Sequence, residues 1–405
     1  MTAAEVEHIN ENMKRIPKVA VFFETSAVND RRIMRGIIKY SSLCGPWLFY
    51  SKIHPFYMLQ GKDAWRKRIL PELRIWGPDG IIAHVDMTKA QELMKVGVPI
   101  ILQPLRGPVS MGSSVLGDDN QAVGEIGAEY LLERGFKNFA FCGFPNVFWS
   151  QERSEAFVKR ILRAGFEPHL YEPPESHRWS FVEEDREFLC KWLISMPKPI
   201  TVMACNDIRG QQVIDACRLA ELIVPDEIAV LGVDNDDLIC DSTNPPLSSV
   251  VLGTEKAGYE AAQLLDRMMH RKKRKWPKTT IHPTHIVTRQ STDILAIDDP
   301  EVAKAVRFIR THRRSEFGVH DVVDATTLAR RTLEQRFKKI LNRSVYQEIR
   351  RVRVEQVTKM LLETTMPVYK IALTLGYSSS EHIARPFRKE IGMSPQEYRR
   401  RYGYG

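Results

Sequence analysis

The stretch that decides the fold of the C-terminal part is "IALTLGYSSSEHIARPFRKEIGMSPQEYRR", residues 371–400. Its first apolar residues have helical spacing and stop at Gly376, and a second helical pattern begins after three serines. Glycine tolerates the positive φ of a tight turn, and a serine can cap the helix that follows it. The stretch therefore predicts a helix-turn-helix unit with an outward second helix that includes His382 and Arg385.

A second copy of this pattern lies 50 residues upstream, in "ARRTLEQRFKKILNRS" at 329–344. Leu333 and Phe337 in this copy correspond to Ile383 and Phe387, so each copy carries an apolar pair four residues apart. Between the copies, residues 346–364 have the apolar stripe of one long helix. The repeat predicts two helix-turn-helix units joined by a helix, which together form an all-α domain.

Charge indicates what this domain binds. From Asp299 to Gly405 the chain has 22 Lys and Arg against 12 Asp and Glu, so the whole net charge of +9 is found there. Such a basic surface attracts a polyanion, and paired helix-turn-helix units favour double-stranded DNA. The alternative is a helical bundle that uses the same helices for protein contacts only.

The preceding part of the chain alternates between short apolar runs and amphipathic helical windows. The runs are "KVAVFF", "DGIIAHV", "VPIILQ", "KNFAFCGF", "PITVMACN" and "EIAVLGVD". Apolar strands separated by helices predict βαβ units with a parallel sheet covered on both faces, and hence an α/β fold. Ligands of such sheets bind at the carboxyl ends of the strands, where this sequence places polar residues.

Several classes of function lack their motifs. The first apolar run is followed by "ETSAVNDRR" without a glycine-rich phosphate loop, so we expect no nucleotide cofactor and no enzymatic activity. The six cysteines have neither metal-ligand spacing nor a disulfide pattern, so most should be core residues and no metal site is expected. No signal peptide or membrane span is evident, and we expect a cytoplasmic protein.

The composition changes after a basic run near residue 275, and Asp299 with Pro300 has the pattern of a helix start. We therefore predict four segments: an N-terminal extension (1–16), an α/β domain (17–293), a linker (294–298) and the helical domain (299–405).

The motif I-A-x-x-x-G-Y, followed by R-x-F-R-K and G-x-S-P-x-x-Y-R, resembles the signature of the AraC/XylS family of transcription regulators. The resemblance implies base contacts from two recognition helices and phosphate contacts from the basic residues beside them. The implied base-contact positions are Arg331, Glu334, Gln335, Ser380, Glu381, His382 and Arg385, and the implied phosphate contacts are Lys338, Lys339, Arg388 and Lys389. Pro386, inside the second recognition helix, departs from the pattern and should kink it.

The stretches "DDNQAVGEIGAEYLLERG" (118–135) and "ACNDIRGQQVIDACRLAELIVPDEIAVLGVDNDD" (204–237) resemble the effector domain of lactose-repressor-type regulators and periplasmic sugar receptors. In that fold two lobes close on a sugar. The implied sugar contacts are Asp30, Trp149, Arg153, Asn206, Asp207, Asp234 and Asn235. The alternatives are that Asp207 is a helix cap, that Asp234 and Asn235 are turn residues, and that Trp149 is a core residue.

Together the two resemblances imply an activator of pentose catabolic genes that a small sugar, D-xylose, switches. Its partners would be double-stranded DNA, RNA polymerase and a second copy in a homodimer, with no membrane contact. The alternative is a cytosolic sugar-binding protein or a sugar-acting enzyme that uses the same cleft.

Overall fold

A computed structural model describes residues 16–51, 65–104, 114–173, 183–270, 278–293, 299–312, 317–377 and 379–402. By its internal contacts the chain forms two compact units. The first, lobe 1, comprises Met1–Asp119, Val147–Trp149 and Leu252–His282. The second comprises the remaining α/β part, which we call lobe 2, together with the C-terminal helical domain. Residues 1–15 of the predicted extension (1–16) and the predicted linker at 294–298 lie outside the described residues.

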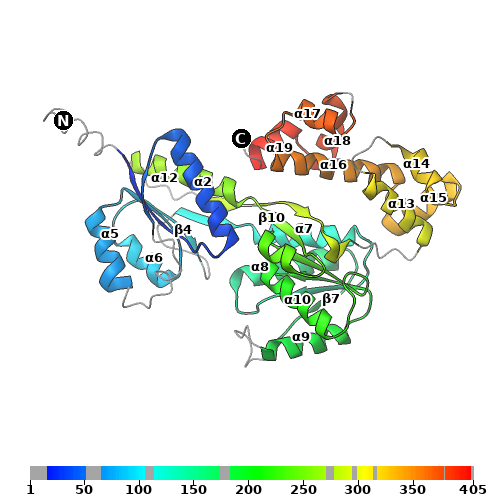
Figure 1. Ribbon diagram of the computed structural model, residues 1–405, viewed down its shortest axis with the longest axis horizontal. Coiled ribbons are helices and arrows are strands. Elements are labelled where there is room, and N and C mark those ends of the chain that lie inside the picture. Colours follow the sequence, from blue (N-terminus) through cyan, green and yellow to red (C-terminus); the bar gives the residue numbers. More distant parts are fainter. Residues whose placement is uncertain are drawn as a thin grey trace. The chain divides into compact units, whose positions relative to one another are not determined.

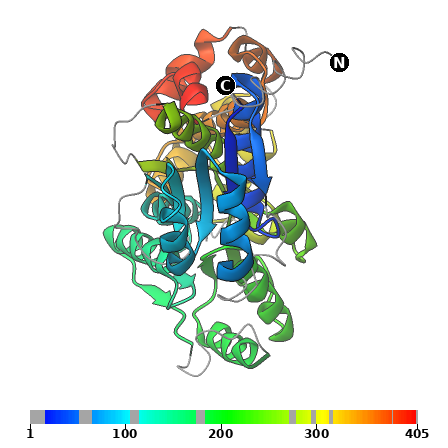
Figure 2. The ribbon, with the colours of Figure 1, turned by 90° about the vertical axis from the view of Figure 1, so that its left-hand side faces the viewer.

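Lobe 1 is built on a six-stranded parallel sheet in the order β11-β5-β4-β3-β1-β2 (Figures 1 and 2). Alternate residues of β1 face opposite sides of the sheet, and Ala20 and Phe22 join a core that includes residues of α5 and α6. Helices α2 and α12 pack against each other. The strands are β1 (Lys18–Phe22), β2 (Leu48–Ser51), β3 (Gly80–Val85), β4 (Ile100–Pro104), β5 (Ser114–Asp118) and β11 (Lys278–Ile281), and the main helices are α2 (Val28–Cys44), α5 (Leu70–Trp76), α6 (Met87–Met94) and α12 (Thr254–His270).

Lobe 2 holds the second six-stranded sheet, in the order β12-β10-β9-β8-β6-β7. Its central strands β8 and β9 are buried at every residue, as the near-continuous apolar runs predict for a sheet covered on both faces. The strands are β6 (Phe139–Cys142), β7 (Pro168–Leu170), β8 (Ile200–Ala204), β9 (Ile228–Val233), β10 (Ser248–Leu252) and β12 (Pro283–Val287). The helices are α7 (Asn120–Leu132), α8 (Phe148–Arg163), α9 (Glu183–Ser195), α10 (Asp207–Leu219), α11 (Asp237–Ser242) and the 3-10 turn η3 (Gln290–Thr292).

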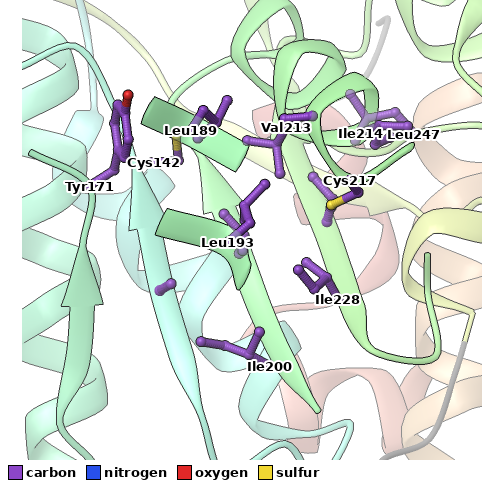
Figure 3. Close-up of a cluster of buried hydrophobic side chains, with 14 of the residues drawn as sticks. Cys142, Tyr171, Leu189, Leu193, Ile200, Val213, Ile214, Cys217, Ile228 and Leu247 are labelled. Carbon is purple, nitrogen blue, oxygen red and sulfur yellow. The ribbon is translucent and has the colours of Figure 1, made fainter. Parts of the chain in front are cut away.

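One face of this sheet packs against α9 and α10 in an apolar cluster that contains Leu189, Leu193 and Val213 (Figure 3). Cys142, Cys217 and Cys240 belong to the same cluster, and Cys205 is buried as well, which confirms that most cysteines are core residues. All six cysteines are free thiols. Among the described residues, no group of His, Cys, Asp and Glu side chains is arranged to hold a metal ion.

The helical domain contains α13 (Pro300–Thr311), α14 (Val319–Asp324), α15 (Arg330–Leu341), α16 (Val345–Glu363), α17 (Val368–Thr374), α18 (Glu381–Ile391) and α19 (Pro395–Tyr402). Asp299 caps α13, because its side chain accepts hydrogen bonds from the backbone N–H groups of Glu301 and Val302. None of the described helices in the chain combines the length and the apolarity that crossing a lipid bilayer requires.

Helix α16 is the single long helix predicted between the two copies, and it contributes to two separate cores. Its first half packs with α13, α14 and α15 around Phe337, and its second half packs with α17, α18 and α19 around Phe387. Both phenylalanines are fully buried. The sequence repeat is therefore a structural repeat, in which each recognition helix is anchored by the apolar pair predicted for it.

The ends of the helices repeat as well. Ser344 and Gln347 form a reciprocal capping box at the start of α16, and Ser394 and Glu397 form the same box at the start of α19. Gly376, in the turn before α18, has a φ of 82°, which confirms the predicted positive-φ turn. In the first copy, which lacks this glycine, the Thr326 hydroxyl donates to the Val323 carbonyl instead.

Candidate functional site

Arg153 organises a polar group at the carboxyl ends of β8 and β9 in lobe 2. It lies on α8 and is buried; its Nε donates to the Asn120 side-chain oxygen at 2.9 Å and its Nη1 donates to the Cys205 carbonyl at 2.7 Å. The same Nη1 lies 3.9 Å from Oδ1 of Asp234, the residue directly after β9. The fixed guanidinium thus presents its charge beside a carboxylate that is partly exposed.

The loop after β9 has an unusual backbone. Asp234 and Asn235 have φ values of 106° and 49°, in a region that residues other than glycine rarely adopt. Such strain costs on the order of 1–3 kcal/mol per residue and persists where the surrounding structure enforces it, which is frequent in ligand sites. Here Ser249 Oγ accepts a hydrogen bond from the Asn235 N–H at 2.9 Å, and Arg289 Nη1 donates to the Asn235 side-chain oxygen at 2.8 Å.

Asp207 supports this loop, whereas its neighbour Asn206 caps a helix. The Asn206 side chain caps α10 by accepting from the Arg209 N–H, so the alternative that Asp207 is the helix cap is wrong: the cap is the residue before it. Asp207 is buried, and its two oxygens accept from Ser249 Oγ at 2.5 Å and from the Asp236 N–H at 2.7 Å. Burial, together with the nearby Asp234 carboxylate, raises the pKa of the Asp207 carboxyl well above its usual range.

In lobe 1, Asp30 lies in the first turn of α2 and is buried. Its two oxygens accept from the Glu24 N–H at 2.6 Å and pair with His84 Nδ1 at 2.8 Å. Burial lowers the pKa of His84, but the nearby carboxylates, above all Asp30, raise it, and the net result is a pKa above the ordinary value. Trp149, partly buried, lies in the first turn of α8.

The outward face of α15 carries most of the residues predicted for it. Arg331, Gln335, Lys338 and Lys339 are exposed. Glu334 differs, because its carboxylate accepts a hydrogen bond from the Val345 N–H at 3.3 Å and so supports the start of α16.

The outward face of α18 has the same character. Glu381, His382, Arg385, Arg388 and Lys389 are exposed, and Ile383 is buried beneath them. Ser380 occupies the N-cap position without a capping hydrogen bond from its side chain. The helix continues through Pro386 from Glu381 to Ile391, although proline has no N–H to donate.

Sequence reasoning missed Arg289, His84 and Arg336. Arg336, on α15, bonds Asp299 Oδ2 at 3.0 Å and thereby ties this recognition helix to the start of α13. Each of the three residues has its partner far away in the sequence, and the pattern around it is that of an ordinary solvated or strand residue. No local signal distinguishes them.

Comparison with known proteins gives two domain matches. Residues 128–292 match the family model described as a periplasmic binding protein-like domain, and residues 322–401 match a helix-turn-helix domain. The first match covers most of lobe 2 and the part of lobe 1 from Leu252 to His282, and the second runs from within α14 to α19.

The similarity to some relatives extends over nearly the whole length of both chains. The xylose operon regulatory protein of Haemophilus influenzae is 30% identical over 396 residues, which cover 94% of this chain and 98% of the relative. Its Escherichia coli K12 counterpart is 27% identical over 94% of this chain and 96% of the relative. A solved structure of a xylose-binding transcription activator matches with a TM-score of 0.59 and 26% identity over 96% of this chain and 98% of the other.

These matches favour a regulator over a stand-alone sugar-binding protein or a sugar-acting enzyme, because they extend through both domains. The chain belongs to the family of the xylose operon regulatory proteins, DNA-binding transcription regulators that join a periplasmic binding protein-like domain to an AraC-type helix-turn-helix domain.

Proposed function

We propose that this regulator responds to a pentose, D-xylose, and activates genes of pentose catabolism. The observation that carries the proposal is the polar group around Arg153 and Asp234, within a chain similar from end to end to xylose operon regulatory proteins. These relatives are xylose operon regulatory proteins, and the chemistry of this group suits a sugar.

A pentose presents several adjacent hydroxyls, each of which donates and accepts hydrogen bonds. A carboxylate can accept from two of them, and a guanidinium can donate to their oxygens. We assign direct sugar contacts to Arg153, Asp234 and Asn235, because Asp234 lies beside the Arg153 guanidinium and the strained loop continues directly into Asn235. Asp207 we assign to support of that loop, because both its oxygens are already engaged in the lobe. Asn206, Asp30 and Trp149 remain proposed contacts.

On the DNA side we assign base contacts to Arg331, Gln335, Ser380, Glu381, His382 and Arg385. An arginine can contact guanine with two hydrogen bonds and a glutamine can do so with adenine. Lys338, Lys339, Arg388 and Lys389 serve as phosphate contacts, which position the protein without reading the sequence. Glu334, which holds the Val345 N–H, serves the helix junction and only secondarily the DNA.

Regulation would follow from a shift between two arrangements of a homodimer. A sugar can shift that equilibrium only by binding one arrangement more tightly than the other. The activated form would recruit RNA polymerase from the cytoplasm, where a DNA-binding regulator acts.

Calorimetry with D-xylose and other pentoses tests the sugar site. Asp234→Ala removes an acceptor from buried hydroxyls and should weaken binding by roughly 1–3 kcal/mol or more. Asp215→Ala is the matched control, because Asp215 is an exposed carboxylate on α10 of the same lobe. Absence of pentose binding to the wild type, or equal affinity of the Asp234→Ala variant, would contradict the assignment.

A further inference from the structure

Among the described residues of the second compact unit, hydrogen bonds and an ion pair connect lobe 2 to the helical domain at Glu133 and at Tyr398. The first contact is at Glu133, directly after α7. Its carboxylate pairs with Arg351 Nη1 at 2.5 Å, and its backbone carbonyl accepts from Arg343 Nη2 at 2.9 Å. Two arginines of the helical domain thus bind one residue of the effector lobe.

Both arginines are held in place from inside the helical domain. Glu348, on the first turn of α16, is fully buried and pairs with Arg343 Nε at 2.7 Å and with Arg351 Nη2 at 2.9 Å. Arg351 also pairs with Glu355 one turn later. Because these side chains are fixed by their own domain, contact with Glu133 costs little additional rotamer entropy. The cluster is therefore preorganised for a carboxylate from the lobe.

The second contact is at Tyr398 on α19. Its hydroxyl donates to the Thr284 carbonyl of β12 at 3.0 Å, and its ring packs edge-to-face on Phe387 of α18, with centroids 5.4 Å apart. The chain passes from lobe 1 to lobe 2 between His282 and Pro283, so Thr284 lies two residues beyond a crossing. The Thr284 hydroxyl in turn donates to the carbonyl of Val251, the last residue before another crossing.

The contacts use the start of α16 and the face of α19, and they leave the recognition helices uncovered. Arg331, Gln335 and Arg385 are exposed in this arrangement. The contacts are therefore compatible with DNA binding, and they hold the recognition helices α15 and α18 in position without covering them.

We propose that Glu133 with Arg351 and Arg343, and Tyr398 with Thr284, form an interdomain dock that couples the effector lobes to the DNA-binding domain. A rearrangement at the crossings reaches α18 through Thr284, Tyr398 and Phe387, while Glu133 fixes α16 as the second point of attachment. This inference rests on the proposed sugar response. Without the dock, the two domains bind their ligands independently.

The test uses the full-length double variant Glu133→Gln with Tyr398→Phe, which keeps both side-chain shapes and removes the Glu133 charge and the Tyr398 hydroxyl. Glu129→Gln is the control, because Glu129 lies one turn earlier on α7 and pairs with Arg160 of the same lobe. We measure affinity for promoter DNA by fluorescence anisotropy with and without D-xylose, and affinity for D-xylose by calorimetry. For the wild type and the control we expect the sugar to change DNA affinity by at least about fivefold, and for the double variant by less than about twofold.

D-xylose affinity should be the same in all three proteins. A double variant that keeps the full sugar response in DNA binding would overturn the dock. Hydrogen exchange provides a readout that needs no ligand: amides of residues 345–351 should exchange faster in the double variant than in the control. Equal exchange in the double variant and the control would also overturn the dock. If the double variant exchanges faster but the wild type binds no pentose, only the proposed effector is contradicted.

Discussion

Asn342 and Gly392 end the two recognition helices in the same left-handed backbone conformation, with φ of 54° and 81°. The two residues lie at equivalent positions of the repeat, and each is followed by a serine that opens a capping box. The connection that redirects the chain after each recognition helix is thus the same, although one copy uses asparagine and the other glycine. Glycine has no β-carbon, and the short asparagine side chain can hydrogen-bond to the nearby backbone. Both residues therefore tolerate this conformation better than most other residues do.

Asn342→Ala should destabilise the helical domain by about 1–2 kcal/mol, because alanine is disfavoured in the left-handed region. Asn342→Gly should keep the wild-type stability or raise it. Hydrogen exchange of the α15 and α16 amides measures the effect locally. Equal exchange in the alanine and glycine variants would show that the backbone conformation at this position is not what limits stability.

The fragment 294–405 should bind DNA by itself, since the positive surplus and both repeats lie there. Its affinity should fall steeply with salt, because contacts to phosphates release counterions. Binding titrations from low to physiological salt provide the measurement. A salt-independent affinity, or DNA binding found only in residues 1–292, would refute the assignment.

The two recognition helices, α15 and α18, should enter successive major grooves on one face of the DNA, about 34 Å apart. Arg331→Ala and Arg385→Ala should each cost about 1–3 kcal/mol and relax the preference at one base pair. We expect the larger loss of discrimination for Arg331→Ala, because Pro386 weakens hydrogen bonding within α18. A panel of single-base operator changes decides this: equal losses speak against the role of Pro386, and unchanged discrimination removes both arginines from the interface.

The pair of His84 and Asp30 should make the stability of lobe 1 depend on pH. The pKa of His84 is raised in the folded state, so its contribution is fully present below the unfolded pKa of about 6.5 and is lost as pH rises through the folded pKa. Thermal unfolding of lobe 1, monitored by hydrogen exchange of the amides in β1 and β3, should show that the wild type is more stable than His84→Gln at pH 5.5. The difference should shrink toward pH 9; a constant difference would mean that the histidine does not titrate against Asp30.

The sequence was sufficient for the elements whose pattern is regular. All six predicted strands and the helical windows between them are present. A short, continuous apolar run between turn signals is typical of a strand that is buried on both faces of a sheet. The strands that were missed, such as β5 "SVLGD" and β10 "SSVVL", are short and mix polar with apolar residues. Their identity comes from the neighbouring strands with which they pair.

Site prediction reached the residues next to strand ends and recognition helices but not their supporting partners. Asp234 could be located because it follows an apolar run, whereas Arg289, which holds Asn235 from 54 residues away, has no local signature. The same holds for Glu133 and Arg351, which are separated by 218 residues. Contacts of this kind depend on how finished elements pack, which single-sequence periodicity does not contain.

Helix α16 sets the distance and the rotation between the two cores to which it contributes residues. Its 19 residues rise about 1.5 Å each, and each residue turns the helix by about 100°. One residue inserted at the middle of α16 would therefore shift the second helix-turn-helix unit only slightly along the axis of α16. The same insertion would rotate that unit about this axis by more than a quarter turn. With the DNA contacts proposed above, we expect the length of this helix to set the rotational phase of the two half-sites, so that a change in one requires a change in the other.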